Sequence, residues 1–328
     1  MLIKGGIHMA FTFERVSPSS AGVKAESIQA FLNSAAAESI DLHSVMLLRH
    51  GKVCFEKWWA PHSPDEFHDM WSFSKSLTST AVGFAVQEGS LSLTDRLVDL
   101  FPDKLPETVS NNLAKAAVQD LLTMSCGHET EPRDYEGDWI RSFLMTEFKY
   151  VPGVMFQYNT MGTNMLCAAL RRRTGQNLTE YLRPRLLDPL GITETRMRFI
   201  LPDGTEPGGS GYQLRTEDMA RFMQFVANKG AWQGTQLLTS DWFDMATTKQ
   251  IETENPVYPA TGSDWLSGYG FQYWCCQPEG VFRADGMYGQ FGIVMPRQDA
   301  VLIITEHTER TQDVLDLVWQ HILPGFEA

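Results

Sequence analysis

The sequence predicts an α+β fold, in which an antiparallel sheet is flanked by helices and a mainly helical region is inserted. Three observations predict this fold. Near the N-terminus, apolar residues 45–48 and 53–59 flank a turn segment, which is the pattern of a β-hairpin. Further apolar segments alternate in the β manner between residues 270 and 305. The residues between follow a helical period, so strands from both ends would complete one sheet.

The N-terminal part begins with a predicted helix over residues 25–38, which carries Ile28, Phe31 and Leu32 on one face. The hairpin follows, and a polar loop then leads to a second helix that contains Ser72. This second helix is expected to end near Gly89, because glycine commonly terminates helices.

The middle of the chain is predicted to be helical and rich in loops. A polar loop is expected over residues 128–138, and helical stretches are expected over residues 117–124, 139–146, 161–174 and 178–187. A Gly- and Pro-rich joint then precedes a strong helix, which Thr216 is expected to cap and Gly230 to end.

The last third is predicted to form a strand meander and a terminal helix, and these complete the sheet. The expected strands cover residues 270–275, 281–284, 291–295 and 300–305, and the helix covers residues 312–322. The predicted domains are a discontinuous α/β sheet domain of residues 9–88 and 205–328, and an inserted helical domain of residues 89–204.

The composition is that of a globular protein with an acidic surface. The 328 residues carry a formal net charge of −13, with 43% hydrophobic and 20% charged residues. Such a charge argues against nucleic acid and anionic membranes as partners. No apolar run approaches the ~20 residues that span a bilayer.

The N-terminal residues and the cysteines together predict a cytoplasmic location. The N-terminus lacks the long apolar core and the small-residue cleavage site of a signal peptide, and Met9 offers an alternative start. The five cysteines are odd in number and mostly lie in apolar surroundings, as expected for buried free thiols.

The first candidate site is the tetrad Ser72-Phe73-Ser74-Lys75, because Ser72 and Lys75 share one face of a helix. A serine hydroxyl is a weak nucleophile until a neighbouring base removes its proton. Burial lowers the pKa of a lysine and lets it act as that base. The N–H of Ser72, near a helix N-terminus, would be free to bind an oxyanion. A capping serine beside a surface lysine would give the same spacing.

Two further segments carry candidate residues. Tyr158 lies between a Pro152-Gly153 turn and a helix, where it could pass protons to a nearby lysine. A core tyrosine bonded to backbone is the alternative. Residues 285–291 join two strands, and their glycines would let the backbone approach a ligand, with the N–H of Gln290 as a second oxyanion donor. An ordinary hairpin turn is the alternative.

Together and in this order, these segments resemble the serine β-lactamase and penicillin-recognising superfamily. The tetrad matches its Ser-x-x-Lys motif, Tyr158-Asn159-Thr160 matches its Tyr-x-Asn motif, and Met287-Tyr288-Gly289 matches its Lys-Thr-Gly or His-Gly-Gly strand. The resemblance covers residues 17–323. It is greatest to the class C β-lactamase-related branch, which includes 6-aminohexanoate-dimer hydrolase and family VIII-type esterases.

The resemblance implies a β-lactamase/transpeptidase-like fold and a serine hydrolase that needs no metal and no cofactor. It implies that Ser72 is the nucleophile, Lys75 its base and Tyr158 the proton shuttle. The implied oxyanion hole consists of the N–H groups of Ser72 and Gln290. The implied substrate-binding residues are Thr160, Met287, Tyr288 and Gly289.

The sequence departs from the family pattern at two positions. Thr160 stands where the family has Asn, and Asn159 lies one residue early. Met287 stands where β-lactamases have a basic residue that recognises the substrate carboxylate, which favours the esterase and nylon-oligomer hydrolase branch. In that branch the loop before the Tyr motif contacts substrate, so the candidates here are Asp134, Tyr135 and Trp139. A solvated acidic loop with one anchoring tryptophan is the alternative.

The resemblance therefore implies an acyl-enzyme hydrolase whose partner is a small ester or linear amide. A β-lactamase or D-amino-acid peptidase is an alternative, which Met287 and the expected cytoplasmic location disfavour. A catalytically inactive binding module of the same fold is a third possibility. The joint presence of Ser72, Lys75 and Tyr158 disfavours it, because a binding module has no chemical need for all three.

Overall fold

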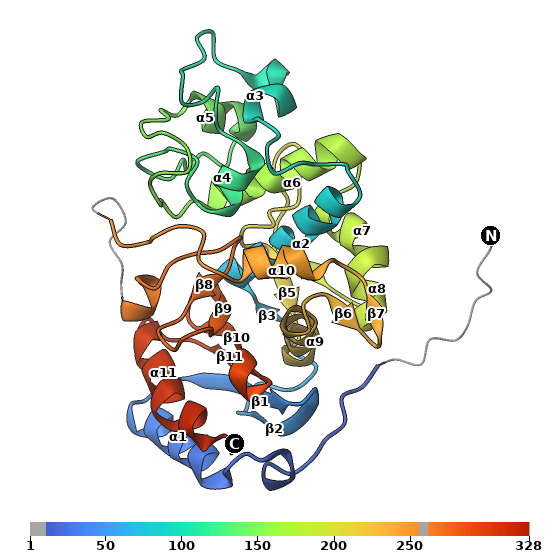
Figure 1. The fold of residues 1–328 in the computed structure, drawn as a ribbon, viewed down its shortest axis with the longest axis vertical. Coiled ribbons are helices and arrows are strands. Elements are labelled where there is room, and N and C mark those ends of the chain that lie inside the picture. Colours follow the sequence, from blue (N-terminus) through green and yellow to red (C-terminus); the bar gives the residue numbers. More distant parts are fainter. Residues whose placement is uncertain (1–10, 256–261, 328) are drawn as a thin grey trace, which may run out of the picture.

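A computed structural model describes residues 11–255 and 262–327 of the chain. Within these residues a six-stranded antiparallel sheet has the order β2-β1-β11-β10-β9-β8 (Figure 1). The strands are β1 (Leu42–Arg49), β2 (Lys52–Trp58), β8 (Trp274–Cys275), β9 (Phe282–Gly286), β10 (Gln290–Met295) and β11 (Ala300–Glu306). The two ends of the chain therefore complete one sheet, as predicted. Met9 and the domain limit at residue 9 lie outside the described residues.

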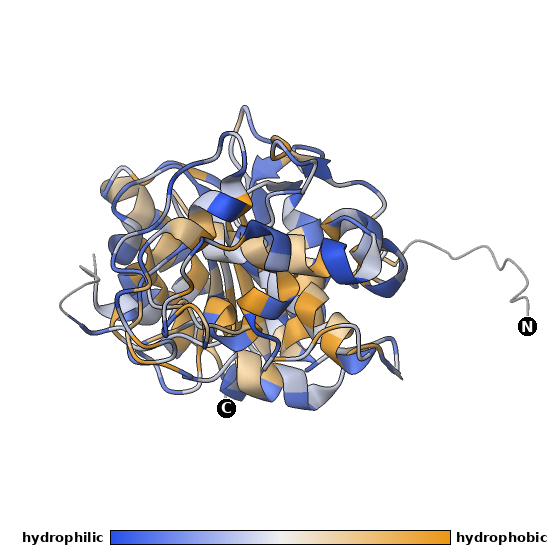
Figure 2. Ribbon diagram, turned by 90° about the horizontal axis from the view of Figure 1, so that it is seen from above, coloured by the Kyte–Doolittle hydropathy of each residue, from blue (hydrophilic) through white to orange (hydrophobic). Residues whose placement is uncertain are grey.

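Alternation along the strands explains why this sheet separates two hydrophobic clusters. On β1, Val45 and Leu47 belong to one cluster of buried residues, and Met46 and Leu48 belong to the other. Successive side chains of a strand point to opposite faces, so a strand that is apolar throughout is covered on both faces. Figure 2 shows the hydrophobic segments gathered in the interior of the molecule.

Helices cover both faces of the sheet. On one side α1 (Ala25–Ala37) lies against α11 (Thr311–Leu317) and the π-helical turn of Val318–Ile322 that continues it. On the other side α9 (Thr216–Ala227) contacts β1, β10 and β11. This layered arrangement confirms the predicted α+β class.

Residues 89–204, between the two parts of the sheet, are mainly helical, and α3, α4 and α5 of this region lie at one end of the molecule (Figure 1). Its helices are α3 (Leu97–Leu100), α4 (Val118–Leu122), α5 (Trp139–Met145), α6 (Thr160–Thr174), α7 (Leu178–Leu182) and α8 (Asp188–Leu190), with a π-helical turn over Arg183–Leu187. The predicted domain limits at residues 88/89 and 204/205 stay a prediction.

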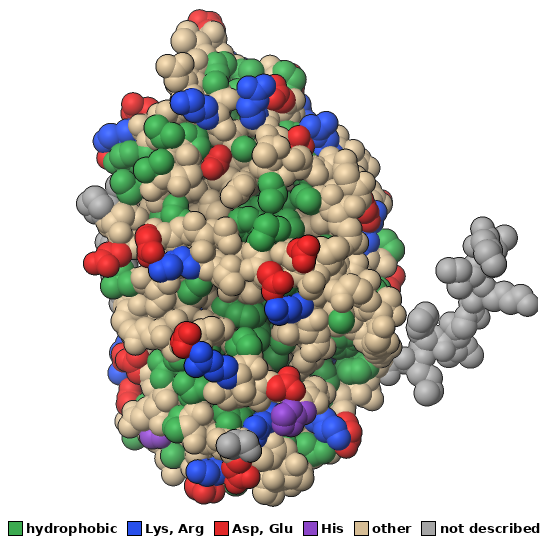
Figure 3. Space-filling model, in the orientation of Figure 1, with side chains coloured by type: hydrophobic (Ala, Val, Ile, Leu, Met, Phe, Trp, Pro, Cys, Tyr) green, Lys and Arg blue, Asp and Glu red, His purple; other side chains and the backbone are tan. Residues whose placement is uncertain are grey.

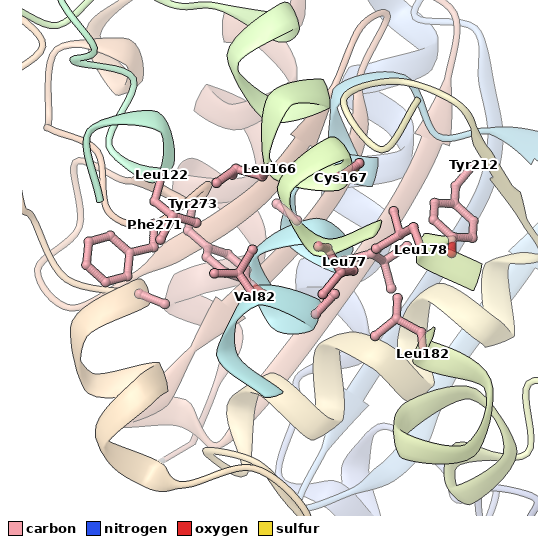
Figure 4. Packing of buried hydrophobic residues seen from close by; sticks show 14 of the residues in the cluster. Leu77, Val82, Leu122, Leu166, Cys167, Leu178, Leu182, Tyr212, Phe271 and Tyr273 are labelled. Atoms are coloured by element: carbon pink, nitrogen blue, oxygen red, sulfur yellow. The ribbon is translucent and has the colours of Figure 1, made fainter. Parts of the chain in front are cut away.

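Helix α2 (Ser74–Gln87) lies at the centre of the molecule and is buried almost along its whole length. Figure 4 shows Leu77 and Val82 of this helix surrounded by side chains from several elements. The surrounding side chains that it labels include Leu122 of α4, Leu166 of α6 and Leu182 of α7. A helix held on all sides in this way gives the residues at its N-terminus fixed positions.

Several short elements were not predicted. These are α10 (Ser240–Ala246), the three-stranded sheet of β3 (His68–Asp69), β5 (Tyr212–Leu214) and β4 (Arg196–Met197), and the hairpin of β6 (Ala231–Trp232) and β7 (Thr235–Gln236). Strands of two or three residues are too short to show a period in the sequence. Conversely, of the predicted strand over residues 270–275 only Trp274 and Cys275 form β8.

The prediction that Thr216 caps α9 is wrong. The N-cap is Arg215, which makes no side-chain capping bond. The Thr216 hydroxyl instead lies 2.7 Å from Ser44 Oγ, between the helix and the sheet. Because Thr216 is buried against β1, its hydroxyl bonds to a side chain of the sheet and does not cap its own helix.

The surface in Figure 3 mixes charges of both signs, and its hydrophobic side chains lie in groups between them. In residues 11–255 and 262–327, none of the helices has both the length and the apolar character that crossing a membrane requires.

Candidate active site

Ser72 lies in a 3-10 turn (Trp71–Phe73) that leads directly into α2. Strand β5 holds this turn at both ends, because Met70 N donates to Tyr212 O (2.9 Å) and Tyr212 N donates to Ser74 Oγ (3.1 Å). Trp71 has a φ of 46°, in the left-handed region that non-glycine residues rarely adopt. The prediction that Ser72 stands at the start of a helix is confirmed.

Lys75 is one helical turn along and points back to Ser72, with Nζ 2.9 Å from Ser72 Oγ. Nζ also donates to Gly209 O (2.6 Å) and lies 3.2 Å from Thr160 Oγ1. A neutral amine has two N–H groups and one lone pair. With the two N–H groups directed to Gly209 and Thr160, the lone pair faces the Ser72 hydroxyl, as a base requires.

The surroundings of Lys75 favour this neutral form. The side chain is 1% exposed, and desolvation lowers the pKa of its amine to about 7. The carboxylates of Glu131 and Asp285 raise it again in part. A lysine with its pKa lowered in this way can be neutral without a strongly alkaline medium, so a base is available.

Tyr158 lies on the other side of the Lys75 amine, with its ring centroid 4.9 Å from Nζ. The ring stacks on Trp274 at a centroid distance of 5.7 Å and an interplanar angle of 16°. Ser72 and Tyr158 line one cavity of about 450 Å³. The other lining residues are Trp265, Trp274, Asp285, Gly286, Met287, Tyr288, Thr308, Glu309 and Thr311.

In the Tyr158-Asn159-Thr160 segment, Asn159 caps a helix and Thr160 contacts Lys75. Asn159 is the N-cap of α6: its Oδ1 accepts from Gly162 N (2.8 Å), and its Nδ2 lies 3.1 Å from Nδ1 of the buried His128. The amide of Asn159 is therefore used inside the fold. Thr160, whose backbone N donates to Glu131 Oε1 (2.6 Å), directs its hydroxyl to Lys75 instead.

A tight turn after β9 sets the direction of a backbone N–H beside Ser72. Gly289 N donates to Gly286 O (3.1 Å), so this oxygen faces the turn and β10. In the described residues only Ala60-Pro61 is a cis peptide, so the Gly286–Met287 peptide is trans. A trans peptide directs its N–H opposite to its C=O. The Met287 N–H therefore points away from β10, and Met287 lines the cavity together with Ser72.

Gln290, the predicted second oxyanion donor, lies elsewhere. It pairs with Gly286 within the β9–β10 ladder, and its side-chain Nε2 donates to Glu306 O (2.7 Å). It lines a different cavity from Ser72. The geometry favours Met287 over Gln290 as the candidate donor, because the turn inserts residues 287–289 between the strand end near Ser72 and the start of β10.

The three loop candidates do not reach the cavity either. Trp139 is buried and donates from Nε1 to Asp203 Oδ1 (2.9 Å). Asp134 is exposed and accepts from Glu136 N (3.0 Å). Tyr135 packs against the hydrophobic core, and burial raises its pKa to about 12. These contacts agree with the alternative interpretation of the three residues, in which they belong to an acidic loop anchored by one tryptophan.

Of the remaining candidates, Met287 and Tyr288 line the cavity. Gly289 does not line it but forms the turn, where its φ is 84° and a Cβ would collide with the Glu306 carboxylate.

The sequence analysis missed several residues that shape the site. Gly209 O accepts from Lys75, and Glu131 accepts from the backbone of Thr160. Both residues lie in loops, and a loop residue leaves no periodic signal in the sequence. Asp285 is held by a buried ion pair with Arg283 (2.8 Å), and the alternation Arg-Ala-Asp along β9 was an available signal for this pair. In the described residues, no group of three or more His, Cys, Asp or Glu side chains is arranged to hold a metal ion.

Comparison with known proteins identifies the family. The Beta-lactamase family model matches residues 35–323 of the chain. The chain is 23% identical to 6-aminohexanoate-dimer hydrolase of Paenarthrobacter ureafaciens over 277 residues, which are 79% of this chain and 70% of that protein.

Solved structures share the fold at low sequence identity. A penicillin-binding protein homologue from Caulobacter crescentus superposes with a TM-score of 0.72 at 15% identity, over 94% of this chain and 99% of that one. A family VIII carboxylesterase gives a TM-score of 0.67 at 15% identity, over 90% and 96%. These matches confirm the resemblance and the fold that the motifs predicted, and the chain belongs to the beta-lactamase family of hydrolases.

Proposed function

We propose that the protein is a serine hydrolase that acts through an acyl-enzyme on small esters or linear amides. The observation that carries this proposal is the Lys75 amine, buried, 2.9 Å from Ser72 Oγ, with acceptors at Gly209 O and Thr160 Oγ1 for its two N–H groups. A lysine that only stabilises the fold does not require a lowered pKa. A lysine that takes the proton of a nucleophile does require one.

In the first half-reaction Ser72 Oγ attacks the substrate carbonyl carbon while Lys75 Nζ takes the hydroxyl proton. The carbonyl oxygen becomes an oxyanion, for which the N–H groups of Ser72 and Met287 are the proposed donors. The bond to the leaving alcohol or amine then breaks. The proton passes from Lys75, with Tyr158 as relay, to the departing oxygen or nitrogen.

In the second half-reaction water attacks the acyl-enzyme. The same basic pair takes the proton of the water, and Ser72 Oγ regains one as the acid leaves. Tyr158 is suited to the relay because its ring lies against Lys75 and its side chain lines the cavity with Ser72.

The cavity lining supports a neutral or amine-bearing substrate over a carboxylate-bearing one. Aromatic walls come from Trp265 and Trp274, and the charged side chains of the lining are the carboxyl groups of Asp285 and Glu309. None of the described lining residues is Lys, Arg or His. A β-lactamase or D-amino-acid peptidase would have to hold a substrate carboxylate among these groups, so we rank it second. The names of two of the relatives, 6-aminohexanoate-dimer hydrolase and a family VIII carboxylesterase, agree with this ranking, whereas the penicillin-binding protein homologue represents the alternative.

The test is labelling of the protein with a fluorophosphonate, followed by intact mass and peptide mapping, on the wild type and on Lys75→Ala. A single adduct on Ser72 that is lost or strongly slowed in Lys75→Ala would support the proposal. No adduct on the wild type, or an adduct spread over several serines, would favour a binding module. A panel of short-chain esters, linear amides and β-lactams would then separate the hydrolase classes.

A further inference from the structure

A second cavity, of about 290 Å³, lies behind Tyr288. Tyr288 lines both cavities, and its ring stacks on His307 at a centroid distance of 4.2 Å. Four of the eight histidines of the chain line this second cavity: His43, His62, His68 and His307. We call it the histidine cavity.

Glu306 is the unexplained group in its wall. The residue is 1% exposed, and neither carboxylate oxygen has a hydrogen-bond partner. The carboxyl group lies against Gly289, where any Cβ would collide with it. A buried carboxylate without a partner is costly, unless it is protonated or a cation joins it. Burial and the nearby carboxylates of Asp41 and Asp285 raise the pKa of Glu306 to about 9. Near pH 7 the group therefore holds a proton, which a cation must displace in order to pair with the carboxylate.

A second polar group of the wall, on His68, is also unpaired. His68 is 6% exposed and its Nε2 has no partner. Burial lowers the pKa of His68 to about 4, so the ring is neutral near pH 7 and Nε2 can accept a hydrogen bond. The remaining carboxylates already have partners: Glu66 in His62 Nδ1 (2.9 Å), and Asp69 in Gln213 Nε2 (2.7 Å) and Arg198 Nε (3.4 Å). No described residue that lines the cavity is Lys or Arg.

The complement of this wall is a small cation that carries several N–H donors. Trp71 and Phe67 also line the cavity, but guanidinium groups already lie over their rings: Arg198 over Trp71 at 3.8 Å, and Arg196 and Arg215 over Phe67 at 4.0 Å each. The unpaired acceptors of the wall are therefore those of Glu306 and His68. The described residues hold no group of side chains arranged for a metal ion, which favours an organic ammonium. We propose that the histidine cavity binds a small primary amine as its ammonium ion, with the Glu306 carboxylate as counter-ion and His68 Nε2 as a second acceptor.

This site is separate from the catalytic group and does not depend on the proposed function. Its occupant would nevertheless rest against Tyr288 and Trp71, whose rings meet edge to face at 5.7 Å. Trp71 directly precedes Ser72 in the sequence, and Tyr288 directly follows Met287.

The experiment is calorimetric titration of the full-length protein with ethylammonium chloride, and with tetramethylammonium chloride as a cation that has no N–H donor. We expect ethylammonium to bind more tightly than tetramethylammonium. In Glu306→Gln its affinity should fall about tenfold or more, as for loss of a charge-assisted hydrogen bond. Glu107→Gln, which removes an exposed carboxylate outside both cavities, is the matched control and should bind like the wild type.

Equal affinity in the wild type and Glu306→Gln, or loss in Glu107→Gln, would overturn the proposal. No binding, or equal binding of the two cations, would overturn it as well. A measurement on the wild type guards against a misfolded variant. In NMR spectra, transferred nuclear Overhauser effects from ethylammonium to the ring protons of His68 or His307 support the site. Effects to the indoles of Trp265 and Trp274 would place the ligand in the catalytic cavity and overturn it.

Discussion

Gly286 packs directly against Met70: a Cβ at this position would overlap the backbone oxygen of Met70. This contact fixes the end of β9, which Met287 follows directly, against the turn that carries Ser72. Glycine is required here by the close approach of two backbones, whatever its φ angle.

Substitution Gly286→Ala should therefore separate the two proposed oxyanion donors. We expect fluorophosphonate labelling of Ser72 to slow by about 10²-fold or more, the usual effect of losing one donor. Gly162→Ala is the matched control, because a Cβ there meets only ordinary contacts of 3.5 and 3.6 Å. Labelling of Gly286→Ala at the wild-type rate would show that Met287 is not a donor.

The pKa of Lys75, lowered by burial to about 7, predicts the pH dependence of acylation. Neutral Lys75 is the active base, so the labelling rate of Ser72 should rise between pH 6 and 8 with a midpoint near 7. The measurement is the second-order labelling rate across this range. A rate that falls as the pH rises would contradict the role of Lys75 as the base.

Substitution of Glu131 provides a second test of Lys75 as the base. Its carboxylate raises the pKa of Lys75, so Glu131→Gln should move the midpoint of the labelling profile to lower pH. The amide oxygen of glutamine can still accept from Thr160 N, which keeps the local contact. Asp134→Asn, in the same loop but with its carboxylate exposed, is the control and should leave the midpoint in place. A shift to higher pH would show that Glu131 acts in another way.

The reach of sequence reasoning is clear from Ser72, Lys75 and Gln290. The first two lie one helical turn apart, and local helix geometry alone brings them together. Gln290 and Met287 lie three residues apart in a turn, and only the direction of one peptide decides which of them faces Ser72. Trp139 shows the same limit, because its indole donates to Asp203, which is far along the chain. A partner of this kind leaves no local signal in the sequence. The sheet was predictable because long alternating strands repeat one rule, whereas two-residue strands do not.

Glu306 predicts an unusual dependence of stability on pH. Its pKa is raised to about 9 in the fold, so the folded state retains a proton that the unfolded state loses above about pH 4.5. Stability should therefore fall as pH rises from about 4.5 toward 9. Glu306→Gln, which resembles the protonated form, should melt about 2 °C or more above the wild type at pH 8 and close to it at pH 4.5. Thermal unfolding at both pH values is the measurement, and equal melting at pH 8 would refute the shift.

The neighbours Asn159 and Thr160 should give opposite results when each is replaced. Asn159→Ala removes the N-cap of α6 and should cost about 1 kcal/mol of stability, while Ser72 is still labelled. Thr160→Val keeps the shape but removes an acceptor for the Lys75 amine, so labelling should slow by about tenfold with little change in melting temperature. Thermal unfolding and labelling of both variants would decide which residue serves the base. Slow labelling of a folded Asn159→Ala, with Thr160→Val unaffected, would restore the asparagine to the role that the family pattern gives it.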